Sequence, residues 1–267
     1  MAENAPVFAG SIPDNYNKYL VPLFFEGYAT DLAEKLDVPN SGAVLELACG
    51  TGAVTKCLRS SLPRKTRLVA TDLNPGMLQT AQSTLSAVEG IEFQVADGTD
   101  LPFEEASFDA VVCQFGVMFF PDKAQGFSEA LRVLKPGGLL YFSVWDSLEH
   151  NSVSKVVHEA AVSLSPEVSF MAMPFGYCDV STIKATLESA GFRGMEISVQ
   201  PRESRASSPN EVVKGLVDGS PLAAELEARN LTEQGREAVE SALKSSFGDG
   251  PIEAPMQAIV FVASKPL

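Results

Sequence analysis

The sequence predicts an α/β protein whose mostly parallel sheet is covered by helices on both faces. The main observation is an alternation: five short apolar, strand-like runs between residues 43 and 145 are separated by segments with a helical apolar period. Strands and helices that alternate in this way imply crossover connections between parallel strands. A hydrophobic fraction of 45% and a charged fraction of 20% are consistent with a sizeable buried core.

The elements follow from local patterns, taken in chain order. The first 40 residues are expected to be helical, because Phe24, Tyr28, Leu32 and Leu36 recur every four residues, and Pro22 suits a first helical turn. The strands expected next are at 43–47, 67–72, 91–97, 108–116 and 139–145. The helices expected between them are at 53–61, through Leu78, Ala81, Leu85 and Val88, and from Phe127 to Leu134, the last of them closed by 135–138.

The pattern loosens after Trp145. A helical piece and an apolar loop are expected within 146–180, a helix with Ile183 and Leu187 that ends at Gly191, a strand near 194–200, polar helical sequence at 205–248 and a last strand at 257–264. Because a core strand returns after each irregular stretch, residues 1–267 are predicted to form one domain. Its predicted parts are a helical cap at 1–40, a core at 43–145, and substrate-side insertions at 146–180 and 205–248.

Composition excludes several classes of protein. The chain has 34 acidic and 20 basic side chains, a formal charge of -14, which opposes nonspecific binding to nucleic acid or an anionic membrane. No apolar run is long enough to span a membrane and the first residues do not resemble a secretion signal, so a cytoplasmic protein is expected. Four scattered cysteines and two histidines have no metal-ligand spacing, so we predict reduced thiols and no metal.

The stretch "VLELACGTGAVT", from Val44 to Thr55, indicates a ligand site. Gly50 and Gly52 lie where the first strand ends and a helix begins, so the backbone can turn tightly and approach a ligand. Asp72 ends the second strand, about where an acid binds ribose hydroxyls, and Asp97 ends the third. Since the carboxyl ends of parallel strands share one edge of the sheet, the glycine turn and both acids should meet there.

Two classes of nucleotide cofactor are candidates for binding at this edge of the sheet. A nicotinamide fingerprint requires a third glycine, and Thr55 stands in its place. Glu46, just before the turn, suits a cationic ligand better than a pyrophosphate. S-adenosylmethionine is such a ligand, because it carries an ammonium group, a sulfonium and a ribose but no phosphate.

Several motifs together resemble class I S-adenosylmethionine-dependent methyltransferases of the ubiquinone/menaquinone-biosynthesis-like group (methyltransferase type 11). They are "VLELACGTG", "TDLNPGML", "VADGTDLPFEEASFDAVVCQFGVMFFPD" and "RVLKPGGLLYFSVW", within residues 43–145, and "LESAGF" extends the match. The resemblance implies a Rossmann-like three-layer sandwich with a seven-stranded sheet in the order 3-2-1-4-5-7-6, the last strand antiparallel, plus N-terminal helices and helical lid insertions. Ala48 departs from the first motif by replacing its first glycine. We expect alanine to tolerate the motif's usual backbone, to narrow the room beside the methionine portion of the cofactor, and to have a small effect.

The resemblance also implies roles at the site. Glu46 would lie near the ammonium group, Asp72 would hold the ribose diol, Leu73 and Met77 would cover the adenine, and Asp97 would accept from its amino group. The alternatives are a surface strand residue for Glu46, a helix cap or turn acid for Asp72 and Asp97, and plain core packing for Met77. In similar methyltransferases an N-terminal helix closes over the cofactor, and a tyrosine hydroxyl can reach the cofactor's carboxylate. Tyr16, Tyr19 and Tyr28 are the candidates here, and half-buried tyrosines on a helical face are the alternative. The predicted cofactor-binding residues are Tyr19, Glu46, Ala48, Gly50, Thr51, Gly52, Asp72, Leu73, Met77, Asp97, Gly98, Gln114 and Phe115.

The acceptor side has a weaker signal. Methionines and aromatics in "FMAMPFGY", residues 170–177, suit an apolar or aromatic acceptor, or simply a packed loop. His150, after the fifth strand, is the candidate general base, and an exposed loop histidine is the alternative. The predicted substrate-pocket residues are Tyr16, Phe119, Trp145, His150, Met171, Met173 and Phe175.

The sequence therefore predicts S-adenosylmethionine-dependent methyl transfer to a small, apolar or aromatic molecule, by in-line displacement driven mainly by positioning. Two alternatives stay open. A nicotinamide-dependent oxidoreductase is disfavoured by Thr55 and by the lack of a Tyr-x-x-x-Lys pair. A non-catalytic S-adenosylmethionine-binding protein is compatible with every motif. No nucleic-acid partner is expected, and a homodimer is neither indicated nor excluded.

Overall fold

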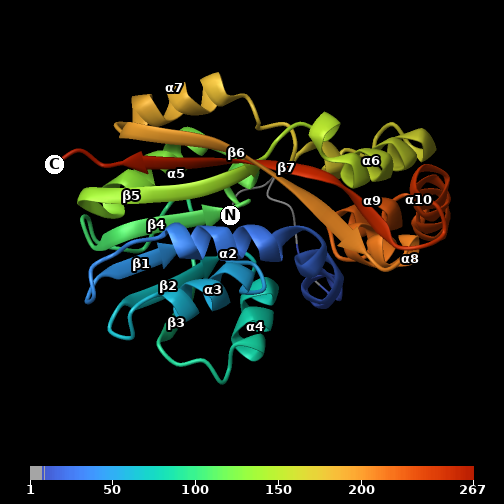
Figure 1. Cartoon of the computed structure of the whole chain (residues 1–267). Coiled ribbons are helices and arrows are strands. Elements are labelled where there is room, and N and C mark those ends of the chain that lie inside the picture. Colours follow the sequence, from blue (N-terminus) through green and yellow to red (C-terminus); the bar gives the residue numbers. More distant parts are fainter. Residues whose placement is uncertain (1–7, 9) are drawn as a thin grey trace.

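The computed structural model describes residue 8 and residues 10–267, and across them seven strands form one sheet in the order β3-β2-β1-β4-β5-β7-β6 (Figure 1). The first five strands are parallel, whereas β7 runs antiparallel to both β5 and β6. The expected order and the antiparallel last strand are therefore confirmed. The strands are β1 (Ala43–Glu46), β2 (Arg67–Asp72), β3 (Ile91–Val95), β4 (Phe108–Gln114), β5 (Leu134–Trp145), β6 (Arg193–Ala206) and β7 (Ile252–Ser264).

Helices cover both faces of this sheet. On one face α2 (Glu26–Lys35) and α3 (Ala53–Ser61) pack through Leu32 and Leu58 onto apolar side chains of β1, β2 and β4. On the other face lie α5 (Lys123–Val133) and α7 (Val180–Ala190), where the ring of Phe127 lies 5.2 Å from that of Phe142 on β5. Helix α4 (Pro75–Thr84) follows β2. Central strands enclosed on both faces must be apolar throughout, which is why they read as continuous hydrophobic runs.

The N-terminal segment is helical from Ile12 to Lys35, as predicted for this part of the first 40 residues. It comprises α1 (Ile12–Asn15), a π-helical stretch η1 (Tyr16–Phe25) and α2. The placement of Pro22 in a first helical turn is wrong, because Pro22 lies inside η1. The wider π turn accommodates a residue that lacks an N–H, and such turns are frequent at functional sites.

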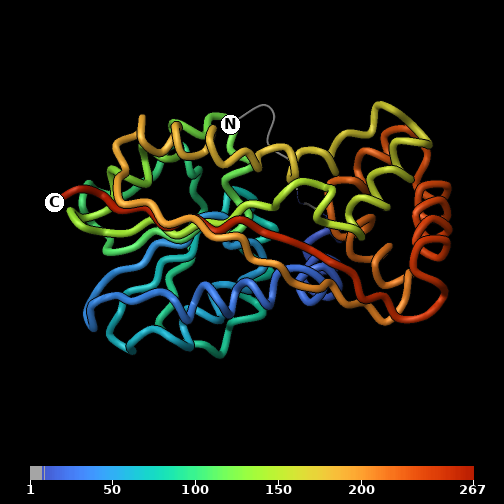
Figure 2. The backbone as a smooth tube through the Cα atoms, turned by 45° about the horizontal axis from the view of Figure 1, so that its top comes forward, coloured from blue at the N-terminus to red at the C-terminus, as the bar shows by residue number. Residues whose placement is uncertain are grey.

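A helical lobe follows β5 and lies at one end of the sheet (Figure 2). Strands β6 and β7 are longer than predicted and run together into this lobe, where Ala206 pairs with Ile252. Helix α6 packs there against α10. The remaining elements are η2 (Val117–Phe119), η3 (Leu148–His150), α6 (Ser152–Leu164), η4 (Phe170–Ala172), α8 (Pro209–Val212), η5 (Val213–Val217), α9 (Leu222–Glu227) and α10 (Thr232–Phe247).

Two further boundaries differ from expectation. Residues 135–138 belong to β5 rather than closing the preceding helix, because Gly137 donates its N–H to the carbonyl of Lys265, next to β7. Val88 lies beyond the end of α4 and is exposed, so it is not part of that helix's buried face. The division of the chain into a cap, a core and two insertions stays a prediction.

All four cysteines are free, and Cys113 is fully buried in the core. In the part of the chain that the structure describes, no helix combines the length and the apolar character that a membrane crossing needs.

Candidate active site

A cavity, here called the outer cavity, opens at the carboxyl ends of β1, β2, β3 and β4. It is the edge at which the glycine turn and the two acids were expected to meet. No Lys, Arg or His lies among the described residues that line it. The predicted cofactor residues that line it are Ala48, Gly50, Asp72, Leu73, Met77, Asp97, Gly98, Gln114 and Phe115.

Asp72 joins two turns of the outer cavity. One carboxylate oxygen accepts from the N–H of Gly50 at 2.8 Å, and the other accepts from the N–H of Asn74 at 2.8 Å. Burial raises the pKa of this carboxyl group, and the two backbone hydrogen bonds counteract the shift. The turn after β1 and the turn after β2 are thus held together by a single side chain.

Gly50 and Gly52, the two glycines of the turn after β1, are required for different structural reasons. Gly50 has a φ of +57°, and a Cβ there would point toward Met77 and the ring of Tyr16, at 3.6 and 3.9 Å. Gly52 has a φ of +89°, and a Cβ there would lie 2.9 Å from the side chain of Leu85. Gly52 therefore permits close packing of the turn on α4 and does not line the cavity, whereas Gly50 does.

Ala48 has a left-handed backbone, with a φ of 52°. This region favours glycine, so alanine adopts the conformation here at a cost in backbone strain. Its Cβ also occupies the space beside Gly116, where an added Cβ would lie only 2.5 Å away. Ala48 and Gly116 thus pack as a matched pair on the floor of the outer cavity.

Three other predicted residues lie outside the cavity lining. Glu46 is buried beneath the turn and accepts from the Thr55 hydroxyl at 2.7 Å, and burial raises the pKa of Glu46 to about 8. Thr51 is also buried. Tyr19 lies between the ammonium groups of Lys18 and Lys214, at 5.0 and 5.5 Å from its ring centre. Their roles at a cofactor stay predictions.

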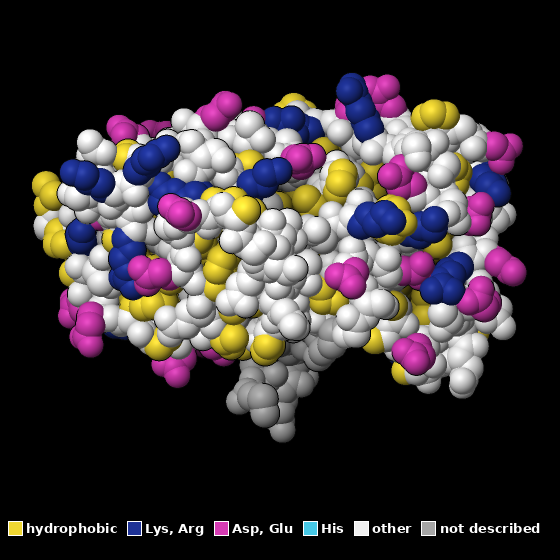
Figure 3. Space-filling model, turned by 90° about the horizontal axis from the view of Figure 1, so that it is seen from below, with side chains coloured by type: hydrophobic (Ala, Val, Ile, Leu, Met, Phe, Trp, Pro, Cys, Tyr) yellow, Lys and Arg dark blue, Asp and Glu magenta, His cyan; other side chains and the backbone are white. Residues whose placement is uncertain are grey.

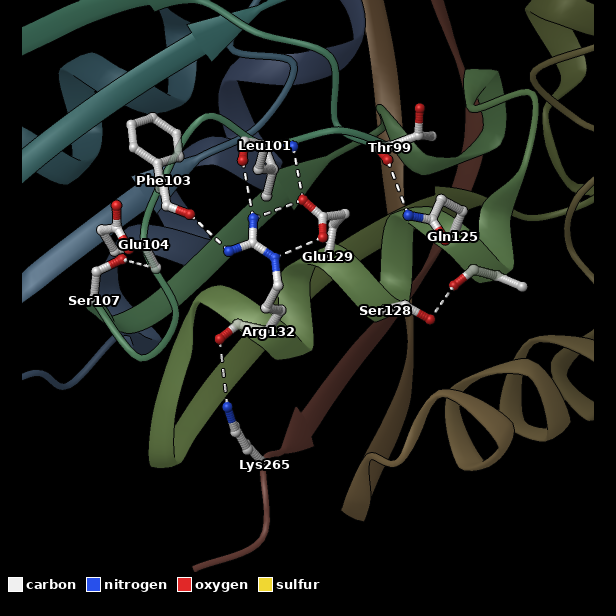
Figure 4. A network of polar contacts seen from close by, with 11 residues as sticks. Thr99, Leu101, Phe103, Glu104, Ser107, Gln125, Ser128, Glu129, Arg132 and Lys265 are labelled. Carbon is white, nitrogen blue, oxygen red and sulfur yellow. Dashed lines mark hydrogen bonds and ion pairs between the residues drawn. The ribbon is translucent and has the colours of Figure 1, made fainter.

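The loop after β3 carries Asp97 and Gly98 and is fixed by α5 (Figure 4). The Arg132 guanidinium donates to the carbonyls of Leu101 and Phe103, at 2.9 and 2.7 Å. Glu129 pairs with Arg132 and accepts from the Leu101 N–H at 2.8 Å. Sequence reasoning missed this support, because Glu129 and Arg132 look like an ordinary i,i+3 surface pair.

Gln114, at the end of β4, faces the outer cavity with an unsatisfied group. Its amide nitrogen donates to the carbonyl of Phe25 at 3.4 Å. Its amide oxygen is buried, and no partner for it exists among the residues that the structure places. Because this oxygen is almost fully covered, it is an unsatisfied polar group next to the outer cavity.

A second cavity, here called the inner cavity, lies behind the first. Phe8, Tyr16, Phe115 and Phe119 line both cavities and form their shared wall. The ring of Phe115 stacks on that of Trp145 with 4.0 Å between centres and an angle of 12°. No charged side chain occurs among the described residues of its lining.

Five of the seven predicted substrate-pocket residues line the inner cavity: Tyr16, Phe119, Trp145, Met171 and Phe175. Met173 does not, and its side chain is largely exposed. His150 also lies outside both cavities, exposed on η3, with Nδ1 3.3 Å from the Ser147 hydroxyl. The lining residues that sequence reasoning missed include Phe8, Phe24 and Phe25, whereas Phe170 belongs to the predicted segment 170–177.

The chain is similar to methyltransferases in each kind of comparison. Residues 45–142 match the family described as "Methyltransferase domain". A demethylmenaquinone methyltransferase of Clavibacter sepedonicus is 34% identical over 57% of this chain and 66% of its own length, just under two thirds. A ubiquinone/menaquinone biosynthesis C-methyltransferase of Hahella chejuensis is 31% identical over 59% of this chain and 70% of its own.

Among solved structures, the YcgJ protein of Bacillus subtilis superposes with a TM-score of 0.61 at 18% identity, covering 90% of this chain and 99% of that one. This likeness extends the shared fold beyond residues 45–142 to most of the chain.

Proposed function

Because this chain belongs to the class I S-adenosylmethionine-dependent methyltransferases, we propose that it transfers a methyl group from S-adenosylmethionine to a small, uncharged, apolar or aromatic acceptor. The observation that carries the proposal is the pair of adjoining cavities. One is lined by carboxylates and contains no basic side chain among its described residues, the other is aromatic, and four residues separate them. This arrangement suits a cationic nucleoside beside a flat apolar molecule.

The outer cavity fits S-adenosylmethionine better than a dinucleotide. A pyrophosphate needs basic side chains or a free helix N-terminus, whereas the described lining offers the carboxylates of Asp72 and Asp97. In this proposal Asp72 holds the ribose diol, Leu73 and Met77 enclose the adenine, and Asp97 with the Gly98 backbone binds the edge of the base. Gly50 and Tyr16 then adjoin the methionine portion.

The chemistry requires little from the protein. S-adenosylmethionine, when bound, would supply an activated methyl group to a lone pair of the acceptor, with the thioether of S-adenosylhomocysteine as the leaving group. The residues of the shared wall hold the acceptor in line and exclude water. Burial raises the pKa of Tyr16, so its hydroxyl stays neutral and does not act as a base at neutral pH.

The composition of the inner cavity supports the acceptor class. Its aromatic walls favour a ring, which is compatible with the quinones for which the two curated relatives are named. Acidic side chains outnumber basic ones, and both are interspersed over the face in Figure 3, which disfavours nucleic acid as the acceptor.

Thermal unfolding with S-adenosylmethionine, S-adenosylhomocysteine or NAD in separate samples tests the cofactor. A ligand at 100 times its dissociation constant stabilises the native state by about 2.7 kcal/mol. We expect both adenosyl compounds to raise the midpoint and NAD to leave it unchanged. A rise with NAD alone would contradict the proposal. Formation of S-adenosylhomocysteine with an aromatic acceptor would then separate an enzyme from a protein that only binds the cofactor.

A further inference from the structure

The inner cavity is smaller than the molecule that it is proposed to bind. Its volume is about 70 Å³. An apolar cavity of about 150 Å³ holds one benzene molecule. Because closely packed protein interiors are barely compressible, part of the cavity wall must move before an aromatic acceptor can enter. The walls differ in how firmly they are held.

Several walls of the inner cavity are fixed by the backbone. Trp145 lies on β5, which pairs with β4 on one side and with β7 on the other. The helical stretches η1 and η5 pack backbone against backbone, since a Cβ at Gly215 would lie 3.4 Å from the backbone nitrogen of Leu20. A Cβ at Gly219, just beyond η5, would lie 2.9 Å from the backbone nitrogen of Tyr16. Movement of η1 or η5 would therefore have to displace the other.

The wall formed by residues 165–176, between α6 and α7, has no such support. This segment contains η4 and contributes Phe170, Met171, Pro174 and Phe175 to the cavity. Among the residues that the structure describes, its backbone-to-backbone hydrogen bonds remain within the segment or reach α6. The hydrogen bonds that join it to any other element come from α9 and the turn that follows α9.

Glu225 on α9 makes most of these hydrogen bonds. Its carboxylate accepts from the N–H groups of Ser169 and Phe170, at 3.0 and 3.1 Å, and from the Ser169 hydroxyl at 3.2 Å. Arg229, just after α9, donates to the carbonyl of Glu167 at 3.1 Å. The side chain of Glu225 is half-buried and lines neither cavity, so it can act on the inner cavity only through η4.

Phe170 connects this contact to both cavities. Its ring lies against those of Phe8 and Phe119, with 6.5 and 6.3 Å between centres, and both of these residues belong to the shared wall. Movement of η4 away from α9 would carry Phe170 out of this aromatic cluster and enlarge the inner cavity. The same movement would break the hydrogen bonds of Glu225.

We propose that Glu225 determines how strongly ring-shaped acceptors bind, because it holds η4 in the position that leaves the inner cavity too small for a ring. Glu225 is thus a positioning residue. Acceptor binding requires η4 to leave the carboxylate, and the free energy of that step lowers the affinity. This inference rests on the proposed function, since it takes the inner cavity as the acceptor site.

Nitrobenzene, an uncharged ring that quenches tryptophan fluorescence, tests the role of Glu225. Trp145 is the chain's single tryptophan and lines the inner cavity, so its quenching reports binding there. We expect Glu225→Ala to bind nitrobenzene about tenfold more tightly than the wild type, because charged hydrogen bonds no longer hold η4. Glu225→Gln keeps one acceptor oxygen and should be intermediate. A residue that only supported the cavity would weaken binding when removed.

Glu227→Ala is the matched control, because Glu227 lies on the same helix, carries the same charge and is exposed. Its affinity for nitrobenzene should stay within about twofold of the wild type. Hydrogen exchange gives an independent measurement. The amides of Ser169 and Phe170 should exchange faster in Glu225→Ala and at an unchanged rate in Glu227→Ala.

Unchanged or weaker binding of nitrobenzene to Glu225→Ala would overturn the proposal, as would equal tightening in Glu227→Ala or a lack of binding to every variant. Calorimetry of S-adenosylhomocysteine keeps the two proposals apart. If it does not bind the wild type, the proposed function fails. If it binds all variants equally and nitrobenzene shows no tightening, only the role of Glu225 fails.

Discussion

The outer and inner cavities differ in where their walls come from. The outer cavity is built mainly from turns at the ends of consecutive strands, between Leu47 and Pro121. The inner cavity takes side chains from distant parts of the chain, from Phe8 to Ser220, and most of them belong to the main hydrophobic core. The topology of the sheet therefore determines where the outer cavity lies, whereas aromatic packing forms the inner cavity. Substitutions in the two cavities should have different consequences.

The largest effect is expected in the inner cavity, where binding and stability share residues. Trp145→Ala removes contacts with Phe24, Phe25, Tyr28 and Phe115 and should lower the free energy of unfolding by about 3–5 kcal/mol. Urea denaturation followed by circular dichroism measures it, with Trp145→Phe as the milder control. A loss below about 1 kcal/mol would show that this cavity is not part of the core.

Asp72→Ala tests the outer cavity, where binding should respond more than stability. Removal of both acceptor oxygens frees the N–H groups of Gly50 and Asn74, and we expect the dissociation constant of S-adenosylhomocysteine to rise about 100-fold. Asp72→Asn keeps one acceptor and should be intermediate. Titration calorimetry that gives equal affinities for Asp72→Ala and the wild type would remove Asp72 from the cofactor site.

Glu46, beneath the turn of the outer cavity, should make the stability of the protein depend on pH. Its pKa is raised to about 8 in the folded protein, so it gives up its proton more readily when unfolded, and ligand-free stability should fall as the pH rises from 5 to 8. Glu46→Gln, which stays neutral, should match the wild type near pH 5 and exceed it by more than about 1 kcal/mol at pH 8. Parallel stability curves for the two proteins over this range would contradict the shift.

The smallest effect is expected at Ala48. Glycine relieves its left-handed backbone but gains freedom in the unfolded chain, so Ala48→Gly should stabilise the protein by at most about 1 kcal/mol. The affinity for S-adenosylhomocysteine should stay within about twofold. Thermal unfolding gives the first quantity and calorimetry the second. A clear destabilisation would show that the Ala48 methyl group matters more for packing than its backbone costs.

The sequence predicted the outer cavity better than the inner one for a physical reason. Helix α3 and strand β2 have the predicted bounds, because a local apolar period and the flanking glycine and acid mark each boundary. Once strands alternate with helices, their ends must share an edge, so Gly50, Asp72 and Asp97 come together without further information.

The inner cavity had a weaker local signal, confined mainly to residues 170–177. No local pattern marks Phe8 and Phe25, and only tertiary packing brings them to this cavity. His150 was chosen for its position after β5, but position along the chain does not fix the direction of a side chain in a short 3₁₀ turn. The expected position of Pro22 was also wrong, because the usual preference of proline for a first helical turn does not hold in the wider π-helical stretch η1.

The pairing of Ala206 with Ile252 closes the base of the helical segment between β6 and β7. Both ends of that segment are held side by side by the sheet, so doubling the length of a flexible stretch within it costs only about 0.6 kcal/mol of chain entropy. The segment also supplies Leu216 and Ser220 to the inner cavity and Leu243 to the core, so its packed helices are not replaceable. The exposed turn at 248–250 is therefore the place where an insertion would leave both the strands and the cavity wall intact.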